Sequence, residues 1–167
     1  MRGKELAGPH CHGFQFNMAW PDPNLIEHLA IKTPRILIVL QIGKHCFEDA
    51  HYSSYELASR IVSMYGHLCD CVLFDRSEGH GELLNPLLVR KYLAAMRRLI
   101  PEMGLGVAGN LGPENLEERL SPLIPEFQNL SHDSFTQIHN ADGSFCPKRA
   151  VEQILRDAKL FEGYGYD

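Results

Sequence analysis

The chain has 167 residues, the length of about one domain, and its 16 Lys and Arg residues against 21 Asp and Glu residues give a net charge of -5. This charge balance, without a long basic cluster, argues against nucleic acid and membrane surfaces as partners. The five cysteines are odd in number and form no C-x-x-C pair, so reduced thiols in a cytoplasm fit best. No segment has the apolar length of a membrane span, and the first residues lack the apolar core of a secretory signal.

Apolar segments with strand character alternate with helix-sized segments along the chain. The clearest is 35–43, a nearly continuous apolar run that is typical of a strand buried on both faces in a parallel sheet. Strands are predicted to start near residues 13, 36, 70, 104 and 127. Helices are predicted over 24–30, 53–66, 86–100, 113–120 and 147–161, with loops over 44–52 and 131–144.

Repeated strand-helix units of this length imply parallel pairing with right-handed crossovers. Two architectures fit such a pattern, an open doubly wound sheet and a (β/α)₈ barrel. Length alone favours the open sheet, because a full barrel normally needs about 200 residues or more. The chain is expected to form one domain over 1–167, with residues 1–11 and 162–167 poorly ordered.

Two loops at predicted strand ends carry candidate chemistry. Asp75 ends an apolar strand and precedes Arg76 and Gly79-His80-Gly81, so it is either a general acid or base at the mouth of the sheet or a residue of an ordinary surface loop. The segment 109–115 joins a glycine turn to a helix start, which either presents backbone N–H groups to an anion such as phosphate or forms a plain strand-helix turn.

His10-Cys11-His12 is similar to the H-x-H motif of metal-dependent hydrolase barrels, since alternate residues of an extended segment can share a metal. The pair precedes its predicted strand, and no later His-x-x-x-His or strand-end aspartate completes a site. A metal-dependent hydrolase that uses His10 and His12 is therefore an alternative, and no metal site or cofactor is predicted.

Taken together, the central motifs resemble phosphoribosylanthranilate isomerase, a (β/α)₈ barrel of tryptophan biosynthesis. In that family a strand ending in L-L-D is followed by a glycine loop, and the next strand ends in A/S-G-G-L-x-P-E-N. The matching stretches here are Val72-Leu73-Phe74-Asp75, Gly79-His80-Gly81 and 108–115. The resemblance covers about 12–161 and implies an α/β fold of parallel units, an incomplete TIM barrel with strands three to seven or eight.

The resemblance also implies roles for individual residues. Asp75 matches the general acid that opens the sugar ring in an Amadori rearrangement. Gly109 and Asn110 match backbone donors to the substrate phosphate, and Ser131 matches a third phosphate ligand. The implied partner is a phosphorylated sugar or a phosphate anion, with a substrate loop made of Arg76, Gly79, His80 and Gly81.

The chain also departs from the family's pattern. The family's general base is a cysteine at the end of the first strand, and this chain begins too late to contain that strand. Ser131-His132-Asp133 replaces S-S-G, which brings a negative charge beside the proposed phosphate. We expect isomerisation only if the missing strands are supplied, and a non-catalytic binding remnant is the alternative. Open edges predict self-association, an N-terminal segment that closes the gap, or a protein start upstream of Met1.

Overall fold

The computed structural model of the chain describes residues 8, 10–33, 35–77 and 80–165. Of the ends expected to be poorly ordered, residues 1–7, 9, 166 and 167 lie outside this part, so that expectation stays a prediction. No helix formed by the described residues is long and apolar enough to cross a membrane.

Five strands in the described part of the chain form one parallel sheet in the order β1-β2-β3-β4-β5. They are β1 (Gly13–Phe16), β2 (Leu37–Ile42), β3 (Cys71–Phe74), β4 (Gly104–Val107) and β5 (Ser131–His132). Every crossover therefore advances by one strand in one direction. A doubly wound sheet would reverse its strand order at a switch point, so that alternative is wrong. The incomplete barrel is confirmed.

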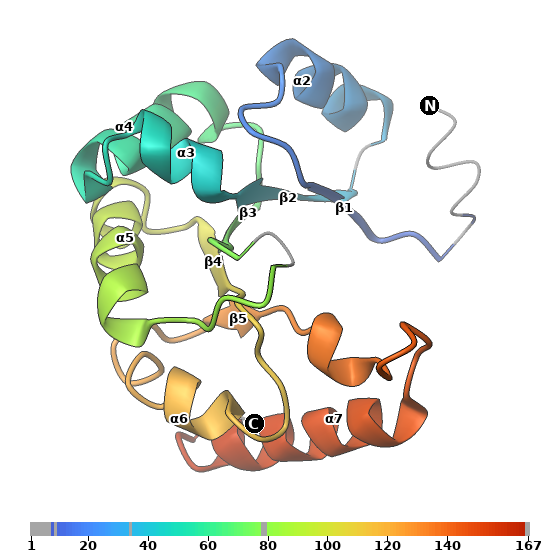
Figure 1. The fold of residues 1–167 in the computed structure, drawn as a ribbon. Helices are drawn as coiled ribbons and strands as arrows, with labels where there is room; N and C mark the ends of the chain where they lie inside the picture. Colours follow the sequence, from blue (N-terminus) through green and yellow to red (C-terminus); the bar gives the residue numbers. More distant parts are fainter. Residues whose placement is uncertain (1–7, 9, 34, 78–79, 166–167) are drawn as a thin grey trace.

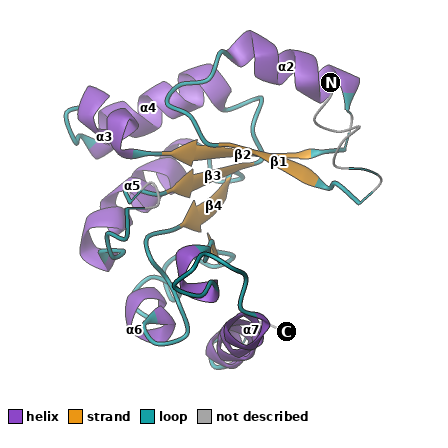
Figure 2. Cartoon of the chain, turned by 45° about the vertical axis from the view of Figure 1, so that its right-hand side comes forward, coloured by secondary structure: helices purple, strands orange, loops and turns teal. Residues whose placement is uncertain are grey.

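The helices lie around the outside of the strands in an open arc (Figure 1). Figure 2 shows the strands side by side, with helices above, below and at one end of them. The helices are α2 (Pro23–Lys32), α3 (Lys44–Asp49), α4 (Ser54–Tyr65), α5 (Pro86–Leu99), α6 (Leu116–Leu120) and α7 (Pro147–Glu162), with a 3₁₀ turn η1 (Thr136–Ile138) before α7.

Alternate residues of each strand face the helices and the concave side of the sheet. The helix-facing side chains, such as Leu40 and Phe74, belong to one buried apolar core. The intervening residues on the concave side are small or polar in β4 and β5, and Leu37 of β2 is 56% exposed there. The apolar core therefore lies between the sheet and the helices. The opposite, concave side of the sheet carries the small and polar side chains.

Two short elements differ from the sequence expectation. The expected loop 44–52 contains α3, a six-residue helix that owes its stability to the burial of Cys46 and Phe47 rather than to its own propensity. The strand expected at 127–130 is a turn that buries Phe127 and Leu130, and β5 follows it. Asn129 has a φ of 66°, which ends an extended chain at that point.

Candidate functional site

A polar cavity of about 300 Å³ lies at the carboxyl ends of the strands, which is where parallel α/β folds place their ligands. We call it the mouth pocket. Residues that end or follow all five strands contribute to it, together with η1. Its lining consists of Gln15, Asn17, Gln41, Asp75, Ser77, Ala108, Gly109, Asn110, Asp133, Phe135 and Thr136.

Asp75 is held in this pocket by donors from its own loop and from β2. Its Oδ1 accepts hydrogen bonds from the backbone N–H of Ser77 at 2.9 Å and from the Ser77 hydroxyl at 2.7 Å. Its Oδ2 accepts a hydrogen bond from Gln41 at 3.0 Å, and Gln41 in turn accepts one from Gln15 at 2.7 Å. Asp75 as a whole is only 9% exposed, and these bonds fix the position and orientation of its carboxyl group.

Asp133 brings a second carboxyl group to the mouth pocket. It follows β5, and its backbone N–H donates to the carbonyl of Val107 at 3.0 Å. Its side chain is exposed at the rim of the pocket, yet the protein groups around it still raise the pKa of Asp133 by partial desolvation, and the negative charge of Asp75 acts in the same direction. Two carboxyl groups in one pocket with different surroundings are the arrangement that acid-base chemistry uses.

The loop after β4 shows why a glycine is needed at the pocket wall. Gly109 has a φ of 134°, and a Cβ there would lie 2.9 Å from the backbone nitrogen of Leu84. The Gly109 carbonyl accepts a hydrogen bond from that same nitrogen at 2.9 Å. Within the described part of the chain, the backbone N–H groups of Gly109 and Asn110 make no hydrogen bond. Both residues line the mouth pocket.

The P-E-N residues that follow stabilise this loop. Asn115 accepts a hydrogen bond from the backbone N–H of Gly112 at 3.0 Å and donates one to the carbonyl of Asn110 at 3.0 Å. Glu114 forms a two-pronged ion pair with Arg149 of α7 at 2.7 and 2.8 Å. Gln137 donates to the Asn110 side chain at 2.6 Å. The motif thus ties the β4 loop to η1 and to the start of α7.

Replacing the arginine of this network should have a pH-dependent effect on stability. The hydrogen bond from Arg149 lowers the pKa of Glu114, so the pair stabilises the folded state above the ordinary glutamate pKa of about 4.3 and loses this contribution as pH falls through the lowered value. Arg149→Gln is therefore expected to lower Tm more at about pH 7 than at about pH 3, because the hydrogen bonds of Arg149 to Gln137 are lost at both pH values and the ion pair weakens as pH falls. Thermal unfolding followed by circular dichroism measures both.

A matched control is Arg156→Gln, because Arg156 pairs with Glu152 one turn away on the same helix α7. Removal of this local pair should shift Tm less at about pH 7, since exposed pairs of this kind contribute little. Equal Tm shifts for Arg149→Gln at the two pH values would contradict the assignment.

The other residues singled out in the sequence lie in different places. Ser131 is within β5, where its hydroxyl donates to the carbonyl of Leu105 at 3.2 Å, and it is not among the lining residues of the mouth pocket. Arg76 lines a neighbouring cavity. His80 is exposed, and the carbonyl of Gly81 accepts a hydrogen bond from Asn110 at 3.2 Å. Gly79 lies outside the described residues.

His10 and His12 are both exposed ahead of β1. Among the described residues, no group of three or more His, Cys, Asp or Glu side chains is arranged to hold a metal ion. The hydrolase alternative therefore gains no support from this part of the chain.

The strand order and the mouth pocket define a class, an incomplete (β/α) barrel with a polar site at the carboxyl edge of its sheet. No family model matches the sequence, and no curated protein matches it. A solved structure that matches is the crystal structure of phosphoribosyl anthranilate isomerase from Thermus thermophilus, at 16% sequence identity and a TM-score of 0.44. The match covers 89% of this chain and 87% of that one.

Proposed function

We propose that the mouth pocket binds a small sugar and that Asp75 and Asp133 act on it as an acid-base pair. The observation that supports this most is that both carboxyl groups line a single polar pocket. Four side-chain amides surround them and can donate to and accept from sugar hydroxyls. These amides belong to Gln15, Asn17, Gln41 and Asn110.

Sugar isomerisation is the reaction that this pair suits best. A base takes the proton from the carbon next to the carbonyl, while an acid gives a proton to the carbonyl oxygen. The raised pKa of Asp133 suits the acid, and the fixed, hydrogen-bonded carboxylate of Asp75 suits the base. This assignment reverses the role that the sequence resemblance implies for Asp75, and it needs no strand-end cysteine.

A phosphate on the sugar is proposed to bind the backbone N–H groups of Gly109 and Asn110. Ser131 is left out of this proposal, because its hydroxyl is bonded to Leu105 away from the pocket lining. Asp133 opposes the phosphate when it is ionised, since like charges repel. The protonation of Asp133 should therefore control how well a phosphorylated sugar binds.

Calorimetric titration with ribose 5-phosphate tests this function. Its affinity should rise as pH falls through the raised pKa of Asp133, because protonation removes a negative charge that faces the phosphate. The phosphate also titrates near pH 6, so Asp133→Asn is the matched control. At about pH 7.5 this variant should bind several-fold more tightly than the wild type. Equal affinity of the two proteins would contradict a phosphate at this site.

An unphosphorylated sugar is the second candidate ligand. The described residues that line the mouth pocket include no Lys, Arg or His, which favours a neutral ligand over an anion. Ribose would then bind as tightly as ribose 5-phosphate, and a protein that binds either one without turnover would be a non-catalytic binding module.

Self-association also stays a prediction. The edge strands β1 and β5 each pair with one neighbour among the described strands. Helix α7 exposes three apolar side chains at helical spacing, Val151, Ile154 and Leu155, each more than half accessible. Unpaired edges and exposed apolar helix faces are the features through which copies of a chain associate.

A further inference from the structure

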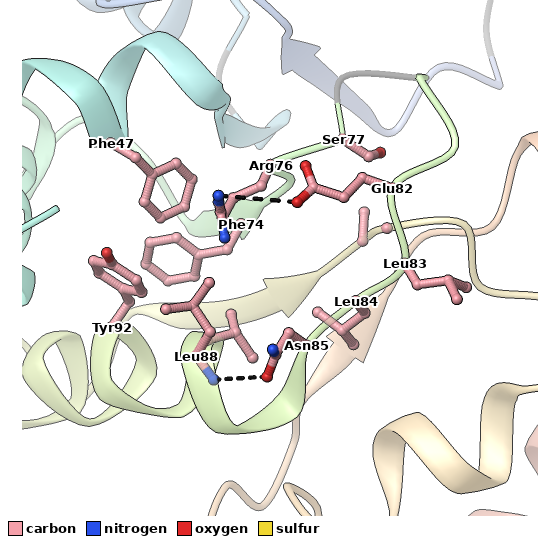
Figure 3. Close-up of a pocket in the computed structure, with 13 residues that line it drawn as sticks. Phe47, Phe74, Arg76, Ser77, Glu82, Leu83, Leu84, Asn85, Leu88 and Tyr92 are labelled. Carbon is pink, nitrogen blue, oxygen red and sulfur yellow. Dashed lines mark hydrogen bonds and ion pairs between the residues drawn. The ribbon is translucent and has the colours of Figure 1, made fainter.

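A second cavity, of about 150 Å³, lies between α3, α5 and the loop that follows β3 (Figure 3). We call it the Arg76 pocket. It shares only Ser77, Ala108 and Gly109 with the lining of the mouth pocket, so most of its surface is its own. The remaining lining residues are Phe47, Phe74, Arg76, Glu82, Leu83, Leu84, Asn85, Leu88, Val89 and Tyr92.

The walls of the Arg76 pocket combine buried aromatic and aliphatic side chains with polar ones, among them Arg76, Glu82 and Asn85. Phe47 and Tyr92 meet edge to face with ring centres 4.9 Å apart, and Phe74 lies 6.0 Å from Tyr92. All three rings are almost completely buried. Figure 3 shows them at the left, with Leu88 below Phe74 and beside Tyr92, and with Leu84 further to the right. The rings pack on one another, so they leave no slot for a further aromatic ring. The rest of the apolar wall consists of methyl groups of leucine residues and of Val89, and such a wall suits a branched aliphatic group.

Arg76 places an incompletely paired cation at this apolar wall. Its Nε is buried and has no hydrogen-bond partner among the described residues. Its Nη2 lies 3.9 Å from the carboxylate of Glu82, whose side chain is 57% exposed, so this ion pair is long and partly in water. A buried donor left unpaired is unfavourable, and a guanidinium prefers a two-pronged carboxylate contact.

We propose that the Arg76 pocket binds a short, branched aliphatic carboxylate. The carboxylate pairs with the guanidinium of Arg76, including its buried Nε, and the aliphatic body packs between the rings and the leucines. The volume of about 150 Å³ limits the aliphatic body to about six carbon atoms, the size of a benzene molecule in a cavity of that volume. This site does not depend on the function proposed for the mouth pocket, because Asp75 and Asp133 take no part in it.

The carboxylate of Glu82 competes with the ligand for the guanidinium of Arg76, because it lies 3.9 Å from Nη2. Removal of the arginine charge should weaken binding, whereas removal of the glutamate charge should strengthen it. A pocket that merely traps apolar molecules would respond to neither change.

The test is ligand-observed NMR titration with 3-methylbutanoate and with its neutral isostere 3-methylbutanamide. The carboxylate should bind saturably, and the amide about tenfold more weakly or not at all. Arg76→Gln should weaken carboxylate binding about tenfold, and Glu82→Gln should strengthen it about threefold. Arg90→Gln is the matched control, because Arg90 is an exposed arginine of α5 outside the pocket lining, and it should leave binding unchanged.

Arg76 also packs near the rings of Phe47 and Tyr52, so its replacement could disturb the loop. Leu88→Phe provides a second variant that fills the pocket from α5 while keeping the charge of Arg76, and it should abolish binding of the carboxylate. Circular dichroism verifies that each variant is folded. Absence of saturable binding to the wild type, equal binding of acid and amide, or weaker binding by Glu82→Gln would each overturn the proposal.

Discussion

Asp75→Asn is expected to slow the exchange of the C2 proton of ribose 5-phosphate with deuterated water by about 10²- to 10⁴-fold. The asparagine keeps the size of the side chain and can still accept the hydrogen bonds of Ser77, but it cannot take up the proton that a base must remove. The loss of the C2 proton signal in one-dimensional NMR spectra measures the rate directly.

Two variants separate this effect from a general loss of structure. Asp133→Asn should also slow the exchange, because the proposed acid is lost. Asp142→Asn, which changes an exposed loop aspartate bonded to Ser144, should exchange at the wild-type rate. Undiminished exchange by Asp75→Asn would remove Asp75 as the base. If the wild type binds the sugar but exchanges no proton, the binding module becomes the better description.

Gly109→Ala should lower the free energy of unfolding by about 2–3 kcal/mol, measured by urea denaturation. The residue has a φ of 134°, and its added Cβ would meet two backbone atoms of Leu84, at 2.9 and 3.1 Å. Backbone atoms cannot rotate away as the end of a side chain can, so either the loop or the strand end must move. Because Gly109 lines both cavities, the same substitution should weaken ligand binding at each of them.

Gly143→Ala is the matched control for this substitution. Gly143 also has a positive φ, of 80°, but its added Cβ meets no atom within 4 Å. Only the conformational cost of a left-handed alanine, about 1 kcal/mol, should then be measured. Equal destabilisation by the two alanines would show that the contact with Leu84 is of no consequence.

The main elements of the fold could be predicted because their side-chain periodicity is local. The helices expected at 53–66, 86–100 and 147–161 correspond closely to α4, α5 and α7. The two-residue strand β5 and the short helix α3 could not be predicted, because neither is long enough to show a period. Phe47 and Phe127 are held in place by burial against other elements, and a local pattern does not report that contact.

Some residues of the candidate site could be predicted from the sequence, and the residues that hold them in place could not. Asp75, Gly109 and Asn110 follow apolar strands, and parallel strands bring their carboxyl ends to one edge, so their convergence on the mouth pocket follows from topology. The residues that hold them were not predictable. Gln41 is 34 positions from Asp75, and Arg149 is 35 positions from Glu114.

The sequence by itself determined the longer helices, four of the five strands and the polar residues that stand at the ends of those strands, because backbone geometry ties each of these to the chemistry of nearby residues. Periodicity alone did not decide the strand order, since repeated strand-helix units are compatible with a doubly wound sheet and with a barrel; the family resemblance implied the barrel, and the tertiary structure decided it. Only the tertiary structure showed that Asp133 lines the mouth pocket together with Asp75. The direction of a side chain after a two-residue strand depends on the packing of the whole sheet, and that packing joins residues far apart in the chain.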